Sequence, residues 1–112
     1  MDIEVEEIVQ EIEAAYSRRD LAKIKEILST INPADIAEIF NSFPTSQRLL
    51  FFRLLAKEEA ADTFVELDGD TQEELIHAFS DNELKDVLDE LYLDDAVDII
   101  EEMPANVVAR II

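Results

Sequence analysis

The side chains best suited to chemistry are carboxylates in the segment Leu93–Glu102. Asp94 and Asp98 are four residues apart, so they share one face if the segment is helical. Because no Lys or Arg lies beside them in the sequence, the two carboxylates repel each other unless a cation lies between them. Oxygen ligands without His or Cys favour Mg²⁺ or Ca²⁺ over zinc or copper. The spacing is therefore compatible with a divalent-cation site at Asp94 and Asp98.

An interpretation without a metal ion accounts for most of the same residues. Asp94 is also placed to cap a helix that begins there, and Asp95 to interact with the positive end of that helix dipole. Only Asp98 then lacks a structural role. The spacing alone leaves both interpretations open.

Residues that could support catalysis are few. His77 is the only histidine, and its position in the sequence pattern predicts an exposed helix face. The chain has no cysteine, and no serine is placed beside the histidine that would have to activate it. With a single glycine, it also cannot form a glycine-rich phosphate-binding loop. The sequence therefore predicts that this chain is not an enzyme.

The acidic charge is concentrated in the second half of the chain. The 112 residues carry 28 Asp and Glu against 9 Lys and Arg, a formal charge of −19. Residues 58–104 hold 18 of these acids and a single base, Lys85. Such a surface repels nucleic acid and anionic lipid, and it attracts cations or a basic protein. The acidic start and the short apolar runs predict a soluble chain without a signal peptide or membrane insertion, most simply cytosolic.

The elements that must position these carboxylates are helices. Apolar residues recur at intervals of three and four throughout, with no sustained alternation of period two. Asn32 before Pro33 and the pattern Ser80-x-x-Glu83 are typical helix starts. The segment 70–73 resembles a capping box in which Asp70 takes the place of Ser or Thr. The chain is therefore predicted to be all-α, with about nine short helices, the last beginning at Pro104.

A repeat of about 24 residues becomes visible when the chain is aligned with itself. The clearest equivalent positions are Phe40/Phe64/Leu88/Ile112, Phe43/Leu67/Leu91 and Phe51/Leu75/Ile99. Two helices per repeat, each burying one face on its neighbours, predict a right-handed superhelix or solenoid. We expect one domain over residues 1–112, with a leading helix in 1–19 and repeats in 20–112. Since Ile112 falls in mid-repeat, we expect the chain to be the N-terminal part of a longer protein.

Three segments, 32–40, 58–67 and 93–104, resemble the cytosolic N-terminal domain of MgtE-type magnesium transporters in their order and spacing. The resemblance covers about residues 20–112. It implies a superhelix of short helices followed by a pair of CBS domains and a transmembrane pore, which lie outside this chain. It also implies a magnesium sensor on the cytoplasmic side of the membrane, in a protein that is a homodimer. In that family, Mg²⁺ bound between this domain and the CBS domains favours the closed channel.

Carried over to this sequence, the family's metal-contacting acids fall on Asp94 and Asp98, with Asp95 as a weaker match. Two acidic surfaces cannot dock until cations neutralise them, and Mg²⁺ keeps several waters when it binds protein carboxylates. We therefore expect weak Mg²⁺ binding by this chain alone, because the site is shared with the CBS domains. The alternative is a non-catalytic helical scaffold that binds a basic protein partner, as in flagellar motor-switch proteins.

Overall fold

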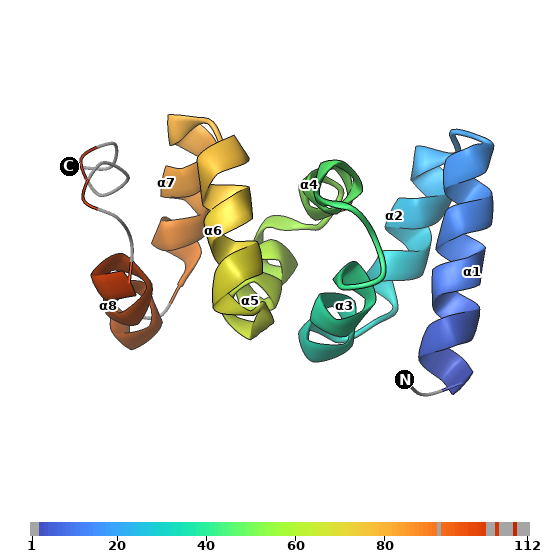
Figure 1. The fold of residues 1–112 in the computed structure, drawn as a ribbon, viewed down its shortest axis with the longest axis horizontal. Helices are drawn as coiled ribbons and strands as arrows, with labels where there is room; N and C mark the ends of the chain where they lie inside the picture. The colour runs from blue at the N-terminus through green and yellow to red at the C-terminus, as the bar shows by residue number, and fades with distance from the viewer. Residues whose placement is uncertain (1–2, 92, 103–104, 106–108, 110–112) are drawn as a thin grey trace.

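The computed structural model describes residues 3–91, 93–102, 105 and 109. These residues contain helices and no strand, so the all-α prediction is confirmed (Figure 1). Eight helices have described bounds: α1 (Ile3–Ser17), α2 (Leu21–Ser29), α3 (Pro33–Phe40), α4 (Thr45–Arg53), α5 (Lys57–Glu66), α6 (Gly69–Ala78), α7 (Asp81–Glu90) and α8 (Leu93–Glu102). The start of the predicted ninth helix, Pro104, lies outside the described residues.

The helix starts follow the period predicted from the sequence. Helices α3, α5 and α7 begin at residues 33, 57 and 81, and α4, α6 and α8 begin at 45, 69 and 93. Each start therefore lies 24 residues after the equivalent one, which makes the repeat a pair of helices. The right-handed superhelical sense stays a prediction.

Helices that are two apart in the chain pack on each other. Helix α5 lies between α3 and α7, helix α4 packs on α6, and α1 packs on both α2 and α3. The molecule is elongated, with extents of 40 × 25 × 21 Å, and α1 and α8 lie at opposite ends (Figure 1). Each repeat therefore contacts its neighbours along the long axis, as in solenoid proteins.

Local side chains cap the starts of α2, α3, α6 and α7. The Asn32 side chain accepts the Asp35 amide at 2.9 Å, and Ser80 forms a complete capping box with Glu83. The cap predicted at Asp70 is wrong: Asp68 caps α6 by accepting the amide of Thr71 at 2.7 Å. The helix begins two residues earlier than the pattern suggested, so Asp70 lies in its first turn, where an acid still favours the helix dipole.

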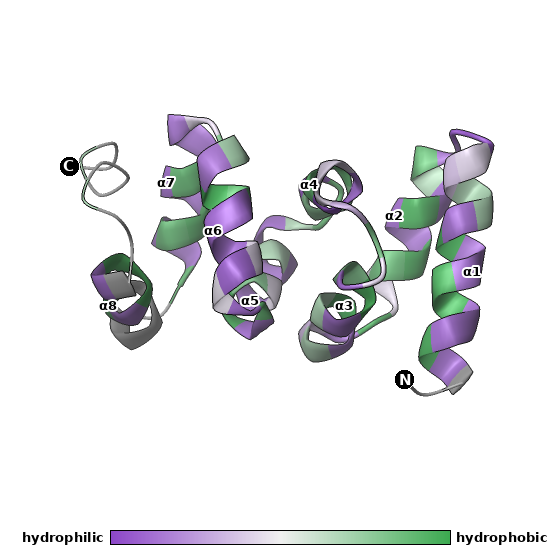
Figure 2. Ribbon diagram, in the orientation of Figure 1, coloured by the Kyte–Doolittle hydropathy of each residue, from purple (hydrophilic) through white to green (hydrophobic). Residues whose placement is uncertain are grey.

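Phenylalanine side chains occupy the centre of the core. Phe40, Phe51 and Phe64 are fully buried. The rings of Phe52 and Phe79 lie 6.2 Å from that of Phe64 and 5.3 Å from each other, joining α4, α5 and the end of α6. Helices α1–α7 all carry both hydrophobic and hydrophilic residues (Figure 2), and burial of the hydrophobic ones holds these short helices together.

Thr63 is a polar residue in this core. It occupies the repeat position of Ile39 and Val87, is fully buried, and its Oγ1 has no hydrogen-bond partner among the described residues. Because an unsatisfied buried hydroxyl is unfavourable, we expect Thr63→Val to stabilise the domain by about 1 kcal/mol, or roughly 4 °C in Tm. Thermal unfolding followed by circular dichroism measures the change.

Thr71→Val is the matched control for Thr63→Val. Thr71 is also buried, but its side chain, unlike that of Thr63, interacts with the carboxylate of Asp68 and helps to lower the pKa of that group. Removing the Thr71 hydroxyl is therefore expected to lower Tm, whereas removing that of Thr63 raises it. A fall in Tm for both variants would show that the Thr63 hydroxyl has a partner in solution.

Candidate functional site

The three acids predicted to bind metal all lie on α8. Asp94 and Asp98 are one helical turn apart, as their spacing predicted, and Asp95 follows Asp94. The Asp98 side chain is exposed, whereas the side chains of Asp94 and Asp95 lie outside the described residues. Among the side chains that are described, no three acidic or histidine groups converge to hold a metal ion. A cation bound at Asp98 would therefore need further ligands, from the remaining residues of the chain, from water or from another domain.

The environment of Asp98 becomes clear by comparison with the preceding repeat. Glu74 lies 24 residues before Asp98 on the equivalent helix, α6. Its Oε2 accepts hydrogen bonds from Arg48 Nη1 at 3.3 Å and from Thr45 Oγ1 at 3.0 Å. The residue equivalent to Arg48 in the next repeat is Gln72, which is neutral. Glu74 therefore has an arginine as its counter-ion, whereas the equivalent position for Asp98 holds a neutral glutamine.

Arg48 and Gln72 also share a structural role. Arg48 Nε donates to the carbonyl oxygen of Phe40 at 2.7 Å, and Gln72 Nε2 donates to the carbonyl oxygen of Phe64 at 2.9 Å. Each acceptor is the equivalent carbonyl near the C-terminal end of the preceding helix in its repeat. Each carbonyl also accepts a backbone N–H, from Phe43 at 3.1 Å for Phe40 and from Leu67 at 3.2 Å for Phe64. The amide of Gln72 thus replaces the carbonyl contact of an arginine without replacing its charge.

Among the described residues, the Lys and Arg side chains that pair with acids of the second half come from the first half. Three such ion pairs between helices are Arg48–Glu74, Arg53–Glu83 and Lys57–Glu90. All three bases precede residue 58, and all three acids follow it. Most acids of residues 58–104 therefore have no base within their own half, and this half forms a strongly acidic surface.

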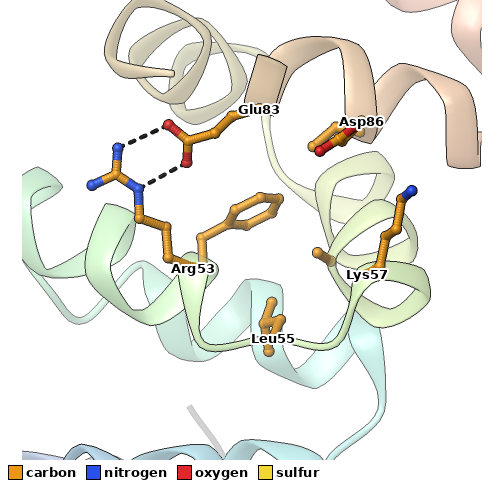
Figure 3. Close-up of a pocket in the computed structure, with 8 residues that line it drawn as sticks. Arg53, Leu55, Lys57, Glu83 and Asp86 are labelled. Atoms are coloured by element: carbon orange, nitrogen blue, oxygen red, sulfur yellow. Dashed lines mark hydrogen bonds and ion pairs between the residues drawn. The ribbon is translucent and has the colours of Figure 1, made fainter. Parts of the chain in front are cut away.

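Arg53 and Glu83 form the closest of these pairs. Arg53 Nε donates to Glu83 Oε2 at 2.8 Å and Nη2 donates to Oε1 at 3.0 Å (Figure 3). These bonds, with the backbone N–H of Ser80, lower the pKa of Glu83 to about 2 against the opposing effect of burial. The pair was not predicted from the sequence, because thirty residues separate its members.

Glu59 shows what happens at the same repeat position without a cation. It lies 24 residues before Glu83, and the position equivalent to Arg53 is Ser29. Burial raises the pKa of Glu59, and no charged partner among the residues that the structure describes opposes that rise. A counter-ion therefore determines whether this repeat position favours the ionised carboxylate.

An open pocket of about 200 Å³ lies beside the Arg53–Glu83 pair, between the α4–α5 connection and α7 (Figure 3). Apolar side chains make part of its lining, and charged ones make the rest. The apolar residues are Phe52, Leu55, Ala60 and Val87, and the charged residues are Arg53, Lys57, Glu83 and Asp86. The pocket was not predicted from the sequence, because it depends on how three helices meet.

These features define an acidic helical-repeat domain. None of its described helices has the length and apolar character needed to cross a membrane. Comparison with models of known families matches residues 31–112 to the MgtE intracellular N domain. The chain therefore belongs to this family, a non-catalytic domain associated with magnesium transporters, and the resemblance seen in the sequence is confirmed. No curated protein matches the chain.

Proposed function

We propose that this chain is a regulatory Mg²⁺-sensing domain of a magnesium transporter or channel. Its acidic half binds divalent cations, docks on adjacent CBS domains of the same protein and thereby favours the closed state. The observation that carries the proposal is Asp98, an exposed carboxylate at a repeat position where Glu74 has Arg48 as its counter-ion. Asp94 and Asp95 on the same helix complete this domain's share of the metal site.

The charge distribution gives the mechanism. Residues 58–104 carry 18 acids and one base, so a second acidic surface is repelled at low Mg²⁺ and approaches when cations neutralise both. The docked arrangement binds the shared ions more tightly than the separated one, so the Mg²⁺ concentration shifts the equilibrium between them. Because Mg²⁺ retains water and takes few carboxylates from one element, binding to this chain alone is weak.

A Mg²⁺ titration followed by ¹H–¹⁵N NMR tests the proposal. We expect shifts centred on residues 93–102 rather than spread evenly over all acids. Asp98→Asn should weaken the fitted affinity about tenfold, since it removes a direct charged ligand from a site with few of them. Asp89→Asn, which removes an equal charge from an exposed position on α7, should change it little. Equal effects of the two variants would show only diffuse attraction of cations.

Gln72→Arg is a second variant for the same titration. It supplies the guanidinium at the position from which Arg48 contacts Glu74, while keeping a donor for the Phe64 carbonyl. The new cation should pair with Asp98 and compete with Mg²⁺, so the affinity should fall by about fivefold without loss of folding. An unchanged Mg²⁺ affinity would show that Asp98 is not a ligand of the metal ion.

The runner-up function is a helical scaffold that binds a basic protein. The shortage of bases in residues 58–104 supports it as well, because the same field attracts Lys and Arg side chains. A scaffold of this kind requires a defined binding site for a basic side chain of the partner.

A further inference from the structure

The pocket between the α4–α5 connection and α7 combines an apolar floor with a charged rim (Figure 3). Phe52, Ala60 and Val87 are 5%, 8% and 7% exposed, so each presents a small part of its surface to the pocket. Leu55, half-buried, extends this apolar lining toward solvent. An occupant with an aliphatic portion would therefore cover apolar surface that water now contacts.

The rim holds two cations and two acids, but both cations are paired with acids, and the acid that pairs with Lys57 is Glu90, outside the rim. Arg53 is held by two hydrogen bonds to Glu83, and Lys57 Nζ lies 3.4 Å from Glu90 Oε1. Both cations of the rim are thus already paired with acids. Asp86, which lies beside Glu83 on α7 and toward Lys57 in Figure 3, has no ion pair or hydrogen bond among the described residues. The uncompensated charge at the mouth is therefore a single exposed carboxylate.

We propose that this pocket receives the side chain of a lysine or arginine from a basic segment of a partner protein. Such a side chain joins an aliphatic stem to a terminal cation, so the stem covers Phe52 and Val87 while the cation pairs with Asp86. An apolar side chain would leave the carboxylate unpaired, and an acidic one would be repelled. The field of residues 58–104 steers the basic segment toward this surface.

This docking site is separate from the proposed Mg²⁺ site. Asp86 lies on α7, and the metal-binding acids lie on the following helix, α8. Asp86 was not among the residues singled out by the sequence, since an exposed Asp on a helix is ordinary. Asp86 becomes a candidate ligand for a basic side chain because it lies beside apolar residues of the pocket and because Arg53 and Lys57 are already paired with other acids.

The probe for the test is the tripeptide acetyl-Ala-Lys-Ala-amide, titrated into the isotope-labelled chain and followed by ¹H–¹³C NMR. We expect the largest shifts at the methyl groups of Leu55 and Val87 and at the ring of Phe52. The equivalent peptide with norleucine, which keeps the stem and lacks the cation, should bind about fivefold more weakly. Equal binding of the two peptides would overturn the proposal in favour of a purely apolar ligand.

Asp86→Asn should weaken the lysine peptide about fivefold and leave the norleucine peptide unchanged. Asp89→Asn, on the same helix and outside the pocket lining, is the control of equal charge. Equal losses for the two variants, or shifts centred on α8 instead of the pocket, would overturn the proposal. Because Asp86→Asn leaves Asp98 intact, the Mg²⁺ titration of this variant should be unchanged, so the two proposals can fail independently.

Discussion

Phe64→Ala is expected to lower the unfolding free energy by about 3–5 kcal/mol, a loss typical of truncating an aromatic side chain at the centre of a core. Phe64 is fully buried and lies on α5, the helix that packs on both α3 and α7. Its ring also contacts those of Phe52 and Phe79. Truncation therefore removes apolar burial and leaves a cavity where several helices meet.

Urea denaturation followed by circular dichroism measures the loss. Phe64→Leu, which keeps most of the buried volume, should cost about 1–1.5 kcal/mol, since apolar substitutions that preserve volume are tolerated best. Leu55→Ala, at a half-buried position, should cost less than Phe64→Ala. A loss below about 1 kcal/mol for Phe64→Ala would place this ring outside the core that the structure assigns to it.

The same substitution tests how the repeats cooperate. In a solenoid, stability is close to a sum of repeat stabilities and interfaces between neighbours. Helix α5 makes the interface on both sides, so weakening it should partly uncouple α1–α4 from α6–α8. We expect the unfolding transition of Phe64→Ala to broaden, with a lower dependence on urea concentration, as two-state behaviour is lost.

The parts of this fold that local chemistry determines were predictable from the sequence. Helices start after Asn32 and Ser80 because each of these side chains accepts a hydrogen bond from the backbone amide three residues later. The 24-residue period was predictable too, since equivalent helices bury equivalent faces. Helices α4 and α5 begin at Thr45 and Lys57 without a side-chain cap, so tertiary packing contributes more to their start.

The candidate site was less predictable because its charges interact across repeats. The spacing placed Asp94 and Asp98 on one helix, but it gave no reason why Asp98 should differ from other exposed acids. That reason comes from Glu74, whose counter-ion Arg48 is 26 residues away in the sequence and has a neutral equivalent, Gln72. Pairs of this kind become interpretable once the packing of α4 on α6 is known.

Arg48 is the second residue for which we expect a large effect, about 2 kcal/mol for Arg48→Met. Its side chain is 17% exposed and joins three groups: the carbonyl oxygens of Phe40 and Asn41, and the carboxylate of Glu74. Methionine fills much of the same space but donates no hydrogen bond. The part-buried carbonyl of Phe40 then loses its side-chain donor, which is the main cause of the expected loss.

Arg48→Gln separates the carbonyl contact from the charge. Gln72 already makes the equivalent contact to Phe64, so glutamine at 48 should keep the bond to Phe40 and lose the pair with Glu74. Because Glu74 is 44% exposed, that loss should cost under about 1 kcal/mol.

Urea denaturation of both variants measures the two contributions. Equal losses of unfolding free energy for Arg48→Gln and Arg48→Met would show that the charge of Arg48 provides the stabilisation. Gln72 would then not replace the structural role of an arginine at its repeat position. If glutamine instead retains most of the stability, the repeat can lose its cation at little structural cost, as at position 72, the repeat equivalent of Arg48.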